Sequence, residues 1–375
     1  MTGKWGRRRQ VAAAAGMSGL AKVGVIAGVG GLTAILVFSM VALTAPLPHI
    51  LVAKETGKDS INPAQLVDVY ACDLGIVFLH NGELHYVFGD TIACSQAKKS
   101  NTMAHGSDLD PIDGLRFDGW ILNGTGQAKE LIPSIKESGK EISAIPTAAV
   151  SINGTIYIWY MSVRQWIWGG DWIANNASIA YSLDGGNTFT KAQNMTWGGN
   201  STFVEFAVVN AGEPVVGGGL VSNYLYLLST QAGRAGDAYL LRVDKTKILS
   251  QLAYEYYMGS LGGIPNWTSD SSQAVSIFKG PIGECSVVWN AYLGKWVAVG
   301  SSYHFGVNIR TASTLWGTWS QPSVAIPTSE YPLSYGGYTH PSMLGENGKY
   351  MYLMVSFFIP YGVYLFRVDV SSLRV

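Results

Sequence analysis

Two aspartates, Asp73 and Asp90, flank a segment with the sequence pattern of a β-hairpin. Asn81-Gly82 between them is typical of a two-residue type I′ turn, because both central positions of that turn need positive φ. With this turn, Asp73 is predicted to lie opposite Asp90, and opposed side chains have Cβ atoms roughly 5 Å apart. Two carboxylates this close do not both ionise easily, so the pKa of one should rise. The pair could therefore supply one acid and one base at the same pH.

The same pair also has a purely structural interpretation. Aspartates at strand ends can cap loop amides or bind a structural calcium ion. Carboxylates with a shifted pKa mark functional sites only on a statistical basis. The elements that position Asp73 and Asp90 therefore decide between the two interpretations.

The composition favours a many-stranded β protein. The 375 residues are 48% hydrophobic and 13% charged, with 45 Gly, 12 Trp and 20 Tyr, which argues against disorder. A formal net charge of zero gives no indication of a nucleic-acid partner. Three cysteines are too few for a disulfide scaffold, although Cys72 and Cys94 could pair in an oxidising compartment. The length allows two domains, but all-β folds of this length often form one.

The N-terminal segment has the pattern of a membrane anchor. Residues 1–22 contain basic but no acidic residues, and residues 23–45 are uncharged and apolar. An apolar run of this length can span a bilayer and exceeds the core of an ordinary signal peptide. We therefore expect a cytoplasmic tail at 1–22, a transmembrane signal anchor at 23–45 and an extracytoplasmic remainder. The alternative is a cleaved signal peptide and a secreted product.

After a predicted linker at residues 46–65, one pattern occurs five times. A tight turn is followed by an apolar, aromatic strand, and no long amphipathic helix intervenes. Such repeats are typical of a β-propeller. We therefore predict an all-β fold, a five-bladed β-propeller over residues 66–375, preceded by the single transmembrane helix. The five copies begin at Asn81, Asn153, Ser222, Leu293 and Asn347.

The strand before each of these turns is predicted to open with polar residues. In a propeller these strands surround one central channel, so their polar ends should converge in a pocket. This convergence favours a functional site at Asp73 and Asp90 over the structural interpretation. The residues concerned are Asp73, Thr147, Glu213, Glu284, and Thr339 with His340.

Three further segments have recognisable patterns. Residues 182–189 match the Asp-box pattern S-x-D-x-G-x-T-W with Phe in the last position, a hairpin turn that indicates fold and not chemistry. Residues 164–172 combine Arg164 with three tryptophans. They suit binding of sugar faces, or equally packing between blades. The aspartates of residues 108–113 lack EF-hand spacing, so we expect a turn-rich loop, and no metal or cofactor is predicted.

A set of short motifs, in the same order and with similar spacing, resembles one family over roughly residues 66–370. It is the domain-of-unknown-function family 4185, which includes endo-D-arabinanases of glycoside hydrolase family 183. Cys72 stands where that family usually has Thr, and Cys94 extends its segment unusually. The motifs are Asp73-Leu-Gly, Phe88-Gly-Asp-Thr91, Ser100-Asn-Thr102, Trp172 with the Asp box, Gly233-Arg234, Tyr254-Glu-Tyr256, Gly283-Glu284-Cys-Ser286, Gly317-Thr-Trp-Ser320 and His340-Pro341.

The resemblance implies a five-bladed propeller that hydrolyses a furanose polysaccharide with inversion, and it places the acidic pair on Asp73 and Asp90. Inversion needs carboxyl groups about 6.5–9.5 Å apart, farther than a directly opposed pair, so Glu284 or Glu213 is kept as an alternative partner. The predicted substrate contacts are Arg164, Trp172, Arg234 and His340.

Two other functions are weighed against the hydrolase. A membrane-anchored propeller that binds carbohydrate or mediates adhesion would keep the aromatic residues and need no catalytic pair. A sialidase-like enzyme is suggested by the Asp box, but no arginine triad is identifiable in the sequence. The expected partners are an arabinan-like polysaccharide and, through the N-terminal helix, a membrane; no nucleic acid is expected.

Overall fold

The computed structural model describes residues 45–167, 170–215, 218–302 and 306–374. These residues form strands joined by turns and short 3-10 helices, which confirms the all-β prediction. The predicted tail at 1–22 and all but the last residue of the predicted anchor at 23–45 lie outside the described residues. Within the described ranges no helix is long and apolar enough to cross a bilayer.

The first hairpin forms where the sequence predicts it. β2 (Ala71–His80) and β3 (Glu83–Ile92) are joined by Asn81-Gly82, whose φ angles are 52° and 87°. Near the turn the predicted register holds, with His80 opposite Glu83 and Val77 opposite Tyr86.

Farther from the turn, the predicted register is interrupted at one position and then resumes, with Cys72 opposite Thr91 and Ala71 opposite Ile92. The ladder shifts on both sides of Leu74, which pairs with Phe88, and Leu74 and Gly75 both have positive φ. Such a bulge bends the strand and re-aims its side chains. Asp73 and Asp90 therefore lie between this bulge and a stretch that keeps the predicted register, and they do not form a regular ladder pair.

The described strands form antiparallel sheets, three of five strands and one of nine. The first sheet contains β2, β3, β4 (Lys98–Lys99), β5 (Thr102–Gly106) and β6 (Gly119–Trp120). The second contains β7 (Ser143–Ile152), β8 (Thr155–Ile167), β9 (Asp171–Ser182), β10 (Thr190–Lys191) and β11 (Trp197–Gly198).

The nine-stranded sheet contains the longest strand, β17 (Ser276–Asn290), which pairs with β14 through its first half and with β18 through its second. Its other strands are β12 (Glu205–Val208), β13 (Tyr224–Thr230), β14 (Gly236–Asp244), β15 (Tyr254–Leu261), β16 (Ile264–Thr268), β18 (Lys295–Ser301), β19 (Val307–Ala312) and β20 (Ser323–Ile326). The last sheet contains β1 (His49–Lys54), β21 (Ser334–Tyr338), β22 (Leu344–Gly345), β23 (Tyr350–Phe357) and β24 (Gly362–Asp369).

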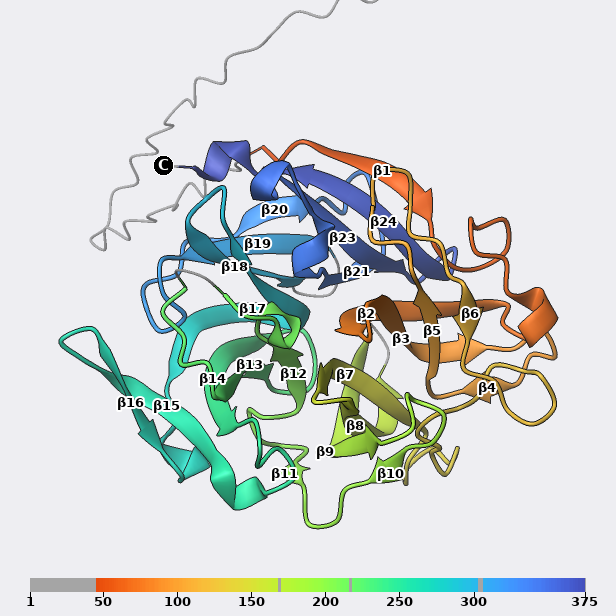
Figure 1. Ribbon diagram of the computed structural model, residues 1–375, viewed down its shortest axis with the longest axis horizontal. Coiled ribbons are helices and arrows are strands. Elements are labelled where there is room, and N and C mark those ends of the chain that lie inside the picture. Colours follow the sequence, from red (N-terminus) through yellow and green to blue (C-terminus); the bar gives the residue numbers. More distant parts are fainter. Residues whose placement is uncertain (1–44, 168–169, 216–217, 303–305, 375) are drawn as a thin grey trace, which may run out of the picture. The chain divides into compact units, whose positions relative to one another are not determined.

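Strands β2, β7, β12, β17 and β21 lie innermost. They contact one another in that order, and β21 contacts β2, so the sheets radiate from a common centre (Figure 1). Each inner strand precedes one of the five predicted turn-and-strand copies, which form β3, β8, β13, β18 and β23. The fold is therefore all-β and propeller-like.

Two boundaries predicted from the sequence are wrong. The third inner strand begins at Glu205, and Glu213 lies beyond it, directly after the 3-10 helix Asn210–Gly212. Part of the predicted linker, His49–Lys54, forms β1, which pairs with β24 near the C-terminus (Figure 1). Its ladder shifts between Leu51 and Ala53, so no two-residue alternation marks this strand in the sequence.

The centre between the inner strands is almost filled by side chains. A cavity of about 20 Å³ lies there, lined by residues of all five inner strands and of the turns that follow them, among them Thr147, Ala207, Cys285 and Thr339. This volume holds about one water molecule. The candidate catalytic carboxylates do not line this cavity, and Asp73 precedes its lining residues on β2.

Two smaller expectations are settled by local contacts. Cys72 is buried, Cys94 is exposed, and both are free thiols, as is the buried Cys285. The Asp box forms the expected turn after β9: the Asp184 carboxylate accepts hydrogen bonds from the amide and hydroxyl of Thr188 at 2.8 and 2.6 Å. These bonds lower the pKa of Asp184 to about 2, in keeping with a structural turn.

Candidate active site

Asp73 is a half-buried carboxyl on the bulged part of β2. The Tyr335 hydroxyl donates to its Oδ2 at 2.7 Å, whereas its Oδ1 has no hydrogen-bond partner among the described residues. Burial, followed by the charge of Asp90, raises its pKa to about 7, although the nearby hydroxyls of Tyr335 and Tyr361 act in the opposite direction. The Asp73 proton is therefore retained close to neutral pH.

The backbone opposite Asp73 leaves room for this carboxyl. A Cβ atom at Gly89 would lie 2.5 Å from Asp73 Oδ1, which is too close for any side chain. This explains the glycine in the Gly-Asp pair that precedes Thr91.

Asp90 has a different environment, although it is also half-buried. Burial raises its pKa above the ordinary value, and the charge of Glu130 adds to this; a hydrogen bond from Ser143 and the charges of Lys98 and Lys136 offset only part of the increase. The Ser143 hydroxyl donates to Asp90 Oδ1 at 2.6 Å. Asp90 thus has a serine hydroxyl and two lysines that stabilise its ionised form. No lysine is among the principal influences on the pKa of Asp73.

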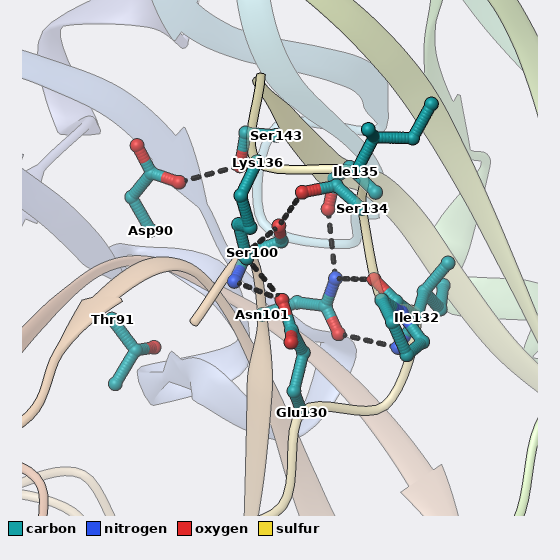
Figure 2. A network of polar contacts seen from close by, with 12 residues as sticks. Asp90, Thr91, Ser100, Asn101, Glu130, Ile132, Ser134, Ile135, Lys136 and Ser143 are labelled. Atoms are coloured by element: carbon teal, nitrogen blue, oxygen red, sulfur yellow. Dashed lines mark hydrogen bonds and ion pairs between the residues drawn. The ribbon is translucent and has the colours of Figure 1, made fainter. Parts of the chain in front are cut away.

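Ser143 is positioned by a network around the buried Asn101 (Figure 2). The Asn101 side chain accepts from the amides of Leu131 and Ile132 and donates to the carbonyls of Ile132 and Ala144, at 2.7–3.0 Å. Because Ala144 follows Ser143, these bonds fix the start of β7 beside Asp90.

Glu284 is tied to Arg234 by a buried ion pair. Arg234 Nε and Nη2 donate to the two carboxylate oxygens at 2.6 and 2.9 Å, and the Ser301 hydroxyl donates to Oε2 at 2.8 Å. Glu284 has φ of 43°, a strained conformation for a residue other than glycine that is found mostly at functional sites. The geometry thus uses Glu284 as an ionised partner of Arg234.

Arg234 connects the two halves of the site. Its guanidinium lies 4.7 Å from the ring centre of Tyr335 and 5.3 Å from that of Trp172. Burial lowers its pKa, but the Glu284 carboxylate more than offsets this and raises it overall. Through Tyr335, the Arg234–Glu284 pair is linked to the Asp73 carboxyl.

Glu205 belongs to the site, and the sequence analysis missed it. It is buried at the start of β12, and its Oε2 accepts the amide of the strained Glu284 at 2.7 Å. Burial and the Glu284 charge hold its pKa well above the usual range. The apolar run after it, Phe206–Val208, was the available signal, but the predicted strand was placed too late.

The structure brings together only some of the predicted substrate contacts. Trp172 and Arg234 are stacked beside the carboxylates. Arg164 is exposed at an irregularity of β8, and its guanidinium pairs with no described residue. His340 is buried and accepts the amide of Ser342 as the cap of the 3-10 helix Pro341–Met343; burial lowers its pKa to about 4.

The acidic loop between the first two sheets serves local structure. Asp108 accepts the amides of Asp110 and Arg116, and Asp110 accepts that of Ile112. Across the described ranges, no group of three or more His, Cys, Asp or Glu residues could hold a metal ion.

Residues 59–367 match the model of a family described as "Domain of unknown function (DUF4185)". The chain belongs to this family. The match confirms the resemblance drawn from the short motifs, and it includes all the carboxylates described above.

Similar proteins come from fungi and bacteria. Notoamide biosynthesis cluster protein J′ of Aspergillus versicolor is 27% identical over 310 residues, which cover 77% of the DUF4185 chain and 81% of the relative. A Bacteroides ovatus structure, provisionally assigned as a hydrolase, has a TM-score of 0.55 at 13% identity and covers 80% of this chain and 86% of its own. A glycosyl hydrolase from the same species has a TM-score of 0.48 at 10% identity, and the match covers 87% of this chain and 95% of that hydrolase.

Proposed function

We propose that this DUF4185 protein is a glycoside hydrolase in which Asp73 is the general acid and Asp90 the general base. Asp73 donates its proton to the departing glycosidic oxygen as the bond to the anomeric carbon breaks. Asp90 takes a proton from the water molecule that attacks this carbon. The observation that carries the proposal is the difference in their partners: Asp73 accepts from Tyr335 and has carboxylates nearby, whereas Asp90 accepts from Ser143 and has two lysines nearby.

The physical basis of the difference lies in their partners. Asp73 has the carboxylates of Asp90 and Glu284 among its neighbours, and both oppose its ionisation. Asp90 accepts from Ser143 and lies near Lys98 and Lys136, which favour its ionisation. Burial raises the pKa of both carboxyls, but only that of Asp90 is partly lowered by lysines, an asymmetry that suits an acid–base pair.

Glu284 has another role in this proposal. Its two oxygens are occupied by Arg234 and Ser301, so it is poorly placed to exchange protons with substrate. It holds Arg234, which in turn packs on the Tyr335 ring beside Asp73. The Arg234 guanidinium can also attract electron-rich substrate oxygens toward the site.

The finer assignments rest on the family resemblance. The proposed substrate is a furanose polysaccharide cleaved within the chain with inversion, as by an endo-D-arabinanase. The fold shared with the provisionally assigned hydrolase of Bacteroides ovatus agrees with hydrolysis in general.

The architecture and location are proposed in the same way. If the nine-stranded sheet is two blades that share β17, the inner strands belong to five blades.

Residues 23–45 are proposed to anchor the chain in a membrane, with the propeller outside the cytoplasm. Fractionation with membranes and an uncleaved N-terminus would support this, and a soluble product that begins just after residue 45 would refute it.

A direct test is release of reducing ends from arabinan and other furanose polymers by the full chain. The wild type should cleave at least one polymer, and Asp73→Asn and Asp90→Asn should each reduce turnover roughly 10²-fold or more. Normal activity in both variants would show that the pair is structural. Binding of a polymer without cleavage by the wild type would instead favour the non-catalytic carbohydrate-binding propeller.

A further inference from the structure

A row of contacting side chains leads outward from Asp73. The Tyr335 hydroxyl bonds the Asp73 carboxyl, and the Arg234 guanidinium lies between the rings of Tyr335 and Trp172. The Trp172 ring then meets the edge of Trp166, with ring centres 6.1 Å apart at an angle of 71°. The row therefore begins at a catalytic candidate and ends at Trp166.

Trp166 is the member of this row that solvent can reach. It is 39% exposed, whereas Trp172, with Arg234 over its ring, is 6% exposed. Trp166 and Trp172 are directly paired across the β8–β9 hairpin, so their side chains point to the same side of it. An exposed indole is thus held on the side of the hairpin that carries the Arg234 contact.

The hairpin that carries Trp166 is fixed to the site. Arg234 Nη1 donates to the Gly170 carbonyl at 3.0 Å while its other nitrogens bind Glu284. Arg234 therefore sets the position of this hairpin relative to the carboxylates. Because the packing row reaches from Trp166 to Asp73, the distance between the indole and the proposed cleavage point is also fixed.

We propose that Trp166 is a binding platform for a sugar unit of the glycan that lies beyond the units at the cleavage point. The C–H face of a furanose or pyranose ring would pack on the exposed indole, because aromatic side chains offer a large, rigid apolar surface with a polar edge. Trp172 cannot serve in this way, since Arg234 occupies its ring. The proposal rests on the proposed function only for the location of the cleavage point.

The consequence is a preference for long substrates. Because Tyr335, Arg234 and Trp172 stand between Asp73 and Trp166, a longer oligosaccharide would gain a contact that a short one held at the carboxyls lacks. Trp166 should therefore affect binding of long oligosaccharides and leave short ones almost unchanged. If Trp166 served only to pack against Trp172, its replacement would change the binding of long and short oligosaccharides equally.

The test measures binding by calorimetry in the full chain carrying Asp73→Asn, so that the probe is not cleaved. The probes are linear arabino-oligosaccharides of two and six units, with xylo-oligosaccharides of the same lengths. Adding Trp166→Ala to this Asp73→Asn protein should weaken hexasaccharide binding about tenfold and leave disaccharide binding unchanged. Trp166→Phe should retain most of the affinity. Trp316→Ala, which removes an indole bonded to the β15–β16 turn, is the matched control and should have no effect.

Each contrary outcome has a definite meaning. Unchanged hexasaccharide affinity in Trp166→Ala, equal losses for both lengths, or no binding of any probe by the parent would overturn the inference. Trp166→Gln provides a second truncation if Trp166→Ala does not fold. Reducing-end release by the chain with Asp73 restored is measured separately. Binding without cleavage would refute the proposed function alone, and cleavage with Trp166-independent binding would refute this inference alone.

Discussion

At the scale of single residues, the surroundings of Asp73 and Asp90 matter more than their identity. Both are half-buried aspartates, yet Asp73 accepts from a tyrosine with other carboxylates nearby, whereas Asp90 accepts from a serine with lysines nearby. The sequence could identify the two aspartates through the Asn81-Gly82 turn. It could not identify Tyr335 as a partner of Asp73 or Glu205 as a partner of Glu284, because these lie on inner strands whose contacts depend on the assembled sheets.

Replacement of Tyr335 by phenylalanine tests the environment of Asp73. The Tyr335 hydroxyl favours the ionised form of Asp73, so its loss should raise the Asp73 pKa further above about 7. The activity of an enzyme that needs Asp73 protonated should then persist to higher pH. The pH dependence of kcat measures this shift in the alkaline limb. The control is Tyr350→Phe, because the Tyr350 ring contacts Lys349 and Arg367. A shift of the alkaline limb of Tyr335→Phe to lower pH would contradict the expected rise in the Asp73 pKa.

At the scale of elements, local sequence explains turns better than bulges. The Asn81-Gly82 turn and the Asp box need only local backbone preferences and side-chain caps, and both form as predicted. The bulge at Leu74 depends on distant partners: its amide donates to Ser356 Oγ at 2.8 Å, and its side chain is buried. A residue other than glycine keeps positive φ only when its surroundings enforce it. The bulge beside Asp73 was therefore not predictable from the hairpin alone, although the register beyond it is the predicted one.

A second feature at the scale of elements is the carboxyl of Glu55, which directly follows β1. Glu55 is fully buried; its Oε1 accepts the Leu115 amide at 3.1 Å, and its Oε2 accepts the Asn62 side chain at 3.0 Å. Burial raises the pKa of Glu55 from 4.5 to about 8. The folded state therefore binds more protons than the unfolded state between these values, and stability falls as pH rises from about 4.5 to about 8.

Glu55→Gln should reduce this pH dependence, because glutamine does not titrate. The wild type should lose on the order of a few kcal/mol of unfolding free energy between pH 5 and pH 8 through Glu55, and the variant should lose less. Urea unfolding at the two pH values measures the difference, with Glu137→Gln, an exposed glutamate paired with Lys140, as control. Equal losses in wild type and Glu55→Gln would show that Glu55 is not held protonated in the folded protein.

At the scale of the described domain, the chain closes by pairing its two ends. β1 and β24 are neighbours in one sheet although they lie at opposite ends of the sequence (Figure 1). The repeated turn-and-strand pattern predicted the propeller-like arrangement of the inner strands. It could not reveal β1, because this strand has no repeat partner and its irregular ladder gives no two-residue alternation.

Deletion of residues 1–54 should therefore be far more harmful than deletion of residues 1–44. The longer deletion removes β1 and leaves β24 with an unpaired edge, which favours aggregation. The shorter deletion keeps the β1–β24 ladder intact. Size-exclusion chromatography and urea unfolding compare the two proteins. If both are monomeric and equally stable, the closing strand does not contribute to the fold as described.

The central claim is that Asp73 donates and Asp90 accepts the proton, and leaving-group dependence tests it most directly. Turnover by Asp73→Asn and Asp90→Asn is compared on the polysaccharide and on a nitrophenyl oligosaccharide, whose leaving group departs without a proton. Asp73→Asn should lose roughly 10²-fold or more on the polysaccharide but little on the nitrophenyl substrate, whereas Asp90→Asn should lose comparably on both. Equal losses on both substrates for Asp73→Asn, or recovery of Asp90→Asn by the better leaving group, would contradict the assignment.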